Sequence, residues 1–140
     1  MIRRFEPQDL SQVTRIWLDA HIRVHGFIST EFWRRGTEEF ERSLAMTDVY
    51  VSVDKHNING FIQLDGNIVM GLFMMFGRQY KKVCLSLLIY AQSLNYSLEL
   101  HAFLQDEEIL KAYQSIGFTP VCNDRNEFTG EPELILQWSA

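Results

Sequence analysis

The chain of 140 residues lacks the features that mark several large classes of protein. Its two cysteines, Cys84 and Cys122, are too few for a disulfide framework or a zinc cluster. Its longest apolar run, residues 68–76, has about half the length that a membrane-spanning helix needs. No apolar segment of the kind found in signal peptides follows the two arginines near the start. These absences predict a cytoplasmic protein that does not associate with a membrane.

Basic residues are also few: the chain has 13 lysines and arginines and 18 acidic residues, which gives a net charge of -5. Proteins that bind nucleic acid usually carry a basic excess, so we expect no nucleic-acid partner. What the sequence does have is apolar material: 46% of the residues are hydrophobic and 13% are aromatic, enough to bury a core. With no repeat or linker in a chain of this length, we expect a single domain over residues 1–140.

Strands and helices are expected in a mixed order along the chain. Apolar alternation and β-branched residues predict strands over residues 1–5, 49–53, 60–64, 68–75, 98–103, 118–122 and 133–138. Helical spacing and start signals predict helices after Pro7, near residue 30, and over residues 37–46, 79–94 and 106–116. This order differs from that of a Rossmann unit or a barrel. It predicts an α+β protein with a mixed, largely antiparallel sheet of about seven strands and helices on both faces.

Four local features sharpen this prediction. The continuously apolar residues 68–75 predict a strand buried on both faces. Gly66 predicts a hairpin turn just before that strand, and Gly117 predicts a left-handed helix end. We expect Cys122 to be a small buried hydrophobic residue.

Residues 112–118, with the sequence Ala-Tyr-Gln-Ser-Ile-Gly-Phe, resemble a signature of the Gcn5-related N-acetyltransferase (GNAT) family, which usually has an aromatic residue in place of Ala112. Residues 60–62, 71–74 and 79–88 also match the family, and the order of elements agrees over nearly the whole chain. The resemblance implies the acyl-CoA N-acyltransferase fold. It also implies transfer of an acetyl group from acetyl-CoA to a primary amine, by direct attack in a ternary complex.

In this family the pyrophosphate of the co-substrate lies on backbone N–H groups at a helix start, in a Gln/Arg-x-x-Gly-x-Gly/Ala loop. Gln79 matches that loop, but Lys82 and Cys84 stand at the two small-residue positions. Either the N–H groups still bind, or the two side chains fill the phosphate site and the chain is a binding or regulatory module. The resemblance implies acetyl-CoA contacts from Phe73, Met74, Gln79, Tyr80, Lys81, Lys82, Val83, Cys84, Leu85 and Asp106. For Asp106 a helix N-cap is the alternative role.

The resemblance gives Tyr113 the role of general acid toward the leaving thiolate. A phenol with a pKa of about 10 is protonated at neutral pH and can donate. Alternatively, Tyr113 only packs by its ring. His101, twelve residues earlier, stands where similar enzymes have a basic glutamate, and its pKa of about 6.5 suits a base. Strand alternation puts Glu99 on the same face as His101. A half-exposed strand histidine without a catalytic role is the other interpretation.

His25, Phe27 and Trp33 fall in the region that lines the acceptor groove in the family, although aromatic residues at helical spacing also build cores. His21 and His25 have the spacing of a metal pair, but nothing supplies further ligands, so we expect no metal. The expected acceptor is a small-molecule or peptide amine: a polyamine, an aminoglycoside, a lysine side chain or a protein N-terminus. A monomer and a homodimer are both compatible with the sequence.

Overall fold

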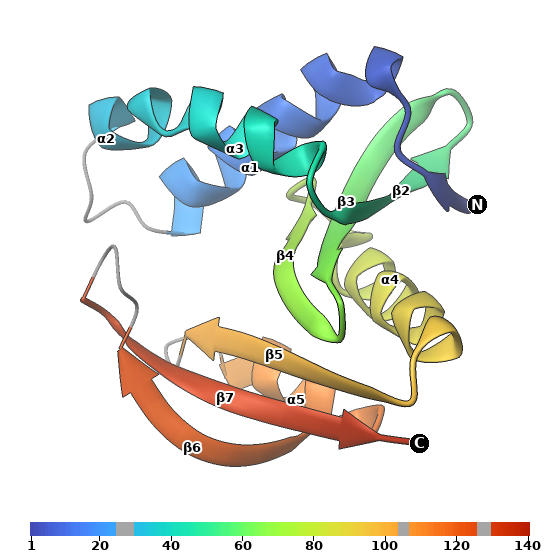
Figure 1. Cartoon of the computed structure of the whole chain (residues 1–140), viewed down its shortest axis with the longest axis vertical. Coiled ribbons are helices and arrows are strands. Elements are labelled where there is room, and N and C mark those ends of the chain that lie inside the picture. Colours follow the sequence, from blue (N-terminus) through green and yellow to red (C-terminus); the bar gives the residue numbers. More distant parts are fainter. Residues whose placement is uncertain (25–29, 104–106, 126–129) are drawn as a thin grey trace.

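The computed structural model of the chain describes residues 1–24, 30–103, 107–125 and 130–140 (Figure 1). Its strands are β1 (Ile2–Arg4), β2 (Asp48–Asp54), β3 (Asn57–Asp65), β4 (Ile68–Met74), β5 (Ser97–Phe103), β6 (Thr119–Arg125) and β7 (Pro132–Ser139). Its helices are α1 (Leu10–Val24), α2 (Thr30–Arg35), α3 (Thr37–Leu44), α4 (Tyr80–Leu94) and α5 (Glu107–Ser115), with a 3-10 turn, Pro7–Asp9, before α1. None of the described helices has the length and apolar character needed to cross a membrane.

The seven strands form one sheet in the order β1-β2-β3-β4-β5-β7-β6. Every neighbouring pair is antiparallel except β4 and β5, which are parallel. Helices α1 to α3 cover one face of the sheet around a core that includes Trp17 and Phe61, and α4 and α5 cover the other around a core that includes Leu87 and Leu100. The prediction of a mixed, largely antiparallel sheet with helices on both faces is therefore confirmed.

The parallel strands β4 and β5 are paired only at the start of β4. The recorded register joins Ile68 to Glu99 and Val69 to Leu100, whereas β4 stays paired with β3 along its length. Figure 1 shows the two strands diverging beyond this point. Backbone groups on this side of β4 and β5 therefore face a gap in the sheet instead of each other.

Two predictions about burial are wrong. Ile68 and Met70 on β4 are 40% and 54% exposed, so this strand is not buried on both faces. The reason is that both side chains lie on the face of β4 that lines an open cleft, where no described helix covers them. Cys122 is exposed, because it lies on β6, an edge strand on which all seven residues are exposed. The turn predictions are confirmed: Gly66 has a φ of 60° between β3 and β4, and Gly117 has a φ of 103° after α5.

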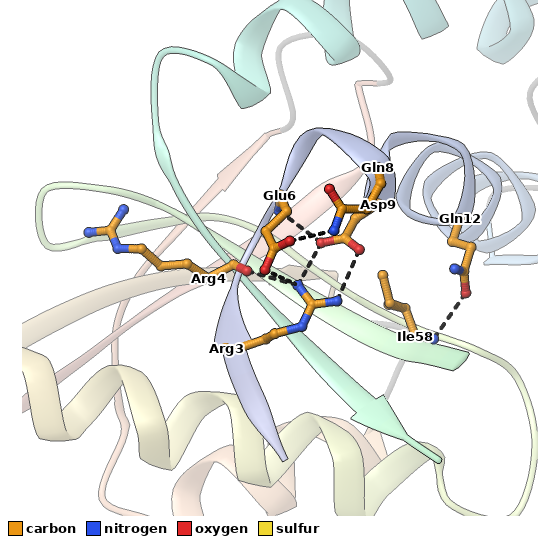
Figure 2. Close-up of polar contacts among 7 residues, drawn as sticks. All are labelled: Arg3, Arg4, Glu6, Gln8, Asp9, Gln12 and Ile58. Atoms are coloured by element: carbon orange, nitrogen blue, oxygen red, sulfur yellow. Dashed lines mark hydrogen bonds and ion pairs between the residues drawn. The ribbon is translucent and has the colours of Figure 1, made fainter. Parts of the chain in front are cut away.

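A buried carboxylate fixes the start of α1 (Figure 2). Arg3 donates from Nη1 to Oδ2 of Asp9 at 2.7 Å and from Nη2 to Oδ1 at 3.0 Å, and the Glu6 N–H donates to Oδ2 at 2.8 Å. The hydrogen bond from Arg3 lowers the pKa of Asp9 despite its burial. One turn further on, Gln12 Oε1 accepts a hydrogen bond from the N–H of Ile58 on β3 at 3.0 Å. These contacts set where α1 lies on the sheet.

Candidate active site

A cleft of about 680 Å³ opens where β4 and β5 separate. One wall is α1, with Arg15, Asp19 and Arg23, and another is the open side of β4. His101 on β5 and Glu133 on β7 form the third wall, and Tyr80 and Tyr113 approach from α4 and α5. Because residues from the helices on both faces line it, the cleft passes through the sheet rather than resting on one face.

His101 lies between two carboxylates. Its Nδ1 is 3.1 Å from Oε1 of Glu133, and its Nε2 is 3.1 Å from Oε2 of Glu99. The Glu133 side chain is 9% exposed, whereas those of His101 and Glu99 are 33% and 31% exposed. Partial burial by itself lowers the pKa of His101, but the hydrogen bonds with Glu99 and Glu133 outweigh it and hold the pKa above 6.5. The expectation that Glu99 shares a face with His101 is confirmed.

Tyr113 reaches the cleft from the opposite side of the sheet. Leu100 belongs to the core under α4 and α5, which also contains Tyr113. Side chains alternate along a strand, so His101 points to the other face, toward the side that carries α1. Both residues line the cleft. A potential base and a potential acid thus meet at the gap in the sheet from its two faces.

The Tyr113 side chain is held in place by packing. The residue is 6% exposed, its ring centroid lies 6.3 Å from that of Phe118, and the Cys84 thiol donates to its hydroxyl at 3.9 Å. Gly117 ends α5. A Cβ at this position would lie 2.9 Å from the Trp138 ring, so the absence of a side chain lets Trp138 pack closely here. The phenol is therefore fixed at the inner end of the cleft.

The start of α4 presents backbone donors. The Tyr80 N–H donates to the Gly77 carbonyl at 3.2 Å, and the first intrahelical bond of the regular pattern runs from the Val83 N–H to Gln79 at 2.9 Å. The first N–H groups of a helix have no partner within the helix, which places those of Lys81 and Lys82 at an end with positive partial charge. The N-terminal end of a helix is therefore a common binding site for phosphate groups.

Lys82 and Cys84, the two residues that differ from the family loop, do not line the cleft. Cys84 is fully buried in the core, and Leu85 is half-buried. Gln79, Lys82 and Val83 line a separate cavity of about 520 Å³ on the side of α4 that faces β2 and β3. Of the described residues in this loop, Tyr80 lines the cleft.

The remaining predicted site residues divide into three groups. His25, Phe27 and Asp106 lie outside the described residues. Phe73 and Met74 line the cleft from β4, and Met74 also belongs to the core. Trp33 is 7% exposed and stacks on His21 with ring centroids 4.0 Å apart, so it supports the cleft wall from behind. His21 itself lines the cleft. Among the described residues no group of side chains is arranged to hold a metal ion.

Sequence reasoning missed four charged residues of the cleft: Glu133, Arg15, Asp19 and Arg23. The contact of Glu133 with His101 depends on the register of β7 against β5, which pairs Phe103 with Glu133 across 30 residues of chain. The two arginines carry a usable signal, since their spacing of eight residues puts them on one side of a helix. Whether that side of the helix faces a cleft can be judged only once the position of α1 on the sheet is known.

The chain is similar to known acetyltransferases in sequence and in fold. Among curated proteins it is 23% identical over 140 residues to the peptidyl-lysine N-acetyltransferase YiaC of Escherichia coli (strain K12). The aligned region covers 99% of this chain and 96% of that relative. No family model matches the chain.

Many solved structures share the fold, including these three. The apo form of YjaB from Escherichia coli has a TM-score of 0.80 at 23% identity, covering 99% of this chain and 96% of that one. A GNAT-family acetyltransferase from Bacillus cereus ATCC 10987 has a TM-score of 0.77 at 18% identity (99% and 96% covered). The PaiA N-acetyltransferase from Thermoplasma acidophilum, solved with coenzyme A, has a TM-score of 0.77 at 15% identity (100% and 98% covered).

These likenesses confirm the predicted fold: the chain has the GNAT acyl-CoA N-acyltransferase fold. They also bear out the resemblance to the GNAT family that residues 112–118 indicate, and they agree with the prediction of an acyltransferase enzyme.

Proposed function

We propose that this protein is an N-acetyltransferase that moves an acetyl group from acetyl-CoA to a primary amine within a ternary complex. One observation carries the proposal: His101 and Tyr113 reach the same cleft from opposite faces of the sheet, where β4 and β5 separate. An amine that enters on the α1 side and a thioester that enters on the α4 and α5 side meet between the two residues.

His101 is the base in this proposal. The imidazolium donates from Nδ1–H to Glu133 and from Nε2–H to Glu99. In the neutral form the Nδ1–H stays on the buried Glu133 carboxylate, and Nε2 no longer donates to Glu99 and is the nitrogen that accepts a proton. Glu99 lies beside that nitrogen and attracts the positively charged ammonium of the acceptor. The ammonium loses its proton to Nε2, directly or through a water, and becomes a nucleophile.

Tyr113 is the acid. The thioester supplies an acyl carbon that an amine can attack, and the reaction forms a C–N bond as the C–S bond breaks. The Tyr113 hydroxyl donates its proton to the departing sulfur, and the second proton that the nitrogen loses as the amide forms returns to the Tyr113 oxygen through water. Because its ring is packed against Phe118 and its hydroxyl is close to Cys84, the donor is already oriented before substrate binds.

The described residues fit an acyl-CoA. The N–H groups of Lys81 and Lys82 at the start of α4 would hold the pyrophosphate, and the open side of β4 at Phe73 and Met74 offers backbone groups to an extended amide chain. The Cys84 side chain lies in the core, and Lys82 lines a different cavity. This placement supports binding despite the missing glycines.

A lysine side chain in a peptide is the first acceptor to test, because the similar protein from Escherichia coli is a peptidyl-lysine N-acetyltransferase. Its long apolar stem suits the apolar wall of β4, where Met70 and Leu72 line the cleft. Small amines and protein N-termini come next in the same assay.

The test is a transfer assay with acetyl-CoA and a lysine peptide, followed by mass spectrometry of the peptide and by release of free thiol. We expect acetylated peptide, and we expect His101→Gln to lower kcat/KM by about 10²-fold or more. The matched control is His56→Gln, at an exposed turn between β2 and β3. If no amine is acetylated and no CoA binds, the protein is instead a binding module with this fold.

A further inference from the structure

We propose that the cleft selects acceptor amines that carry an anionic group a short distance from the amine, above all lysines flanked by aspartate or glutamate. This inference rests on the proposed acetyl transfer and adds a class of substrate to it. It comes from the opposite charges on the two walls of the acceptor side of the cleft.

The α1 wall is basic. Arg15 and Arg23 both line the cleft and are exposed, and eight residues of helix place their backbones about 12 Å apart. Asp19 lies between them on the same wall, which leaves one net positive charge there.

The two cleft arginines differ from most others in the chain. Four arginines form ion pairs with carboxylates: Arg3, Arg4, Arg35 and Arg42. Within the described residues, no carboxylate lies within ion-pair distance of Arg15 or Arg23, although the chain has an excess of acidic residues. Their guanidinium groups are therefore available to an anion that enters the cleft.

Arg23 is also held at the cleft edge. Its guanidinium lies 5.0 Å from the centroid of the Phe76 ring, which is 74% exposed just beyond β4. A guanidinium stacked on an aromatic ring loses part of its hydration and conformational freedom before a ligand arrives. Its planar fork can then bind a carboxylate through two parallel hydrogen bonds.

The opposite wall is acidic. Glu133 lines the cleft beside His101, and Glu99 lies next to the cleft, 3.1 Å from His101 Nε2. The two carboxylates give this side a net negative charge whether or not the imidazole is protonated. It attracts the ammonium of the acceptor, while the α1 wall repels cations and attracts anions. An acceptor with an amine at one end and a carboxylate near it matches both walls at once.

The same chemistry occurs in a lysine with acidic neighbours and in free lysine, which has its own carboxylate. The cleft extends along α1 for at least the two turns between Arg15 and Arg23, which suits a peptide segment better than a single amino acid. We therefore commit to the peptide and use free lysine as the comparison.

The test uses three peptides that are identical except for the residues flanking one lysine, which are glutamate, glutamine or arginine. We expect kcat/KM to be about tenfold higher for the glutamate peptide than for the glutamine peptide, and lowest for the arginine peptide. The double variant Arg15→Gln with Arg23→Gln should abolish most of that preference. Arg34→Gln, on the exposed side of α2, is the matched control.

Equal rates with all three peptides would overturn the inference, and so would a double variant that keeps the preference. A double variant that slows every peptide equally and weakens CoA binding would assign the arginines to the co-substrate instead. Free lysine that outperforms every peptide would also overturn the choice of a peptide. Calorimetric titration with the same peptides measures the preference without turnover, so failure of acetyl transfer would leave this inference testable by itself.

Discussion

Nδ1 of His101 on β5 lies 3.1 Å from Oε1 of Glu133 on β7, a contact between residues 32 positions apart in the chain. Only 7% of the Glu133 residue surface is exposed, so its carboxylate has little water around it, and hydrogen bonding within the protein takes the place of that water. The contact fixes the orientation of the imidazole and leaves Nε2 on the side of Glu99. Glu133 is thus a positioning residue for the proposed base.

The pH dependence of acetyl transfer reports the ionisation of His101. A base must be deprotonated, and the carboxylates hold the pKa of His101 above 6.5, so kcat/KM should rise with pH and reach half its plateau above pH 6.5. Removing one carboxylate charge with Glu133→Gln should move that midpoint to lower pH. Initial rates measured over about four pH units, from about pH 5 to about pH 9, span the ordinary histidine range and give the midpoint for both proteins. A midpoint that stays in place in the variant would contradict the role of Glu133.

The same contacts predict how stability depends on pH. The folded-state pKa of His101 is raised, so its contribution to the free energy of unfolding is fully present below the unfolded pKa of 6.5 and is lost as pH rises through the folded value. His101→Gln should therefore destabilise the protein most at acidic pH. Urea unfolding of both proteins at several pH values measures the difference. A difference that grows toward alkaline pH would show that the carboxylates do not stabilise the imidazolium.

Tyr113→Phe removes a single hydroxyl from a packed ring. We expect kcat to fall by about tenfold or more, since the leaving thiolate loses its proton donor, while the affinity for CoA changes little. Steady-state kinetics and calorimetry on the same preparation separate the two effects. Tyr96→Phe is a suitable control, because Tyr96 is 91% exposed before β5. Full activity in the Tyr113 variant would remove its assignment as the acid.

The carboxylate at the start of α1 is expected to be structural. Asp9→Ala leaves the Glu6 N–H without its acceptor and removes both hydrogen bonds from Arg3 to the carboxylate, which should cost about 1–3 kcal/mol in the free energy of unfolding. Asp48→Ala breaks the exposed pair with Arg4 and should cost no more than about 1 kcal/mol. Chemical denaturation compares them. Equal losses would mean that the contacts of Asp9 add nothing beyond a surface ion pair.

Local chemistry made much of the fold predictable. Glycines at positions 66 and 117 indicate a turn and a helix end because few other residues adopt a positive φ. The alternation of residues 98–103 correctly places Glu99 beside His101, since side chains two apart on a strand share a face.

Features that depend on long-range geometry could not be predicted. The apolar pattern of β4 is the same whether this face of the strand meets a helix or a cleft, so the exposure of Met70 follows only from the position of the cleft. The contact of Glu133 with His101 requires the register of two strands that are distant in sequence. The direction of the Lys82 side chain depends on how α4 is rotated against the sheet.

The central claim is that the cleft between β4 and β5 binds acetyl-CoA although the loop before α4 lacks its usual glycines. Calorimetric titration of the protein with acetyl-CoA, and separately with CoA, tests it most directly. The placement of Lys82 and Cys84 away from the cleft predicts micromolar binding of both. The absence of binding up to millimolar concentrations would contradict the claim and would make the protein a GNAT fold without its co-substrate.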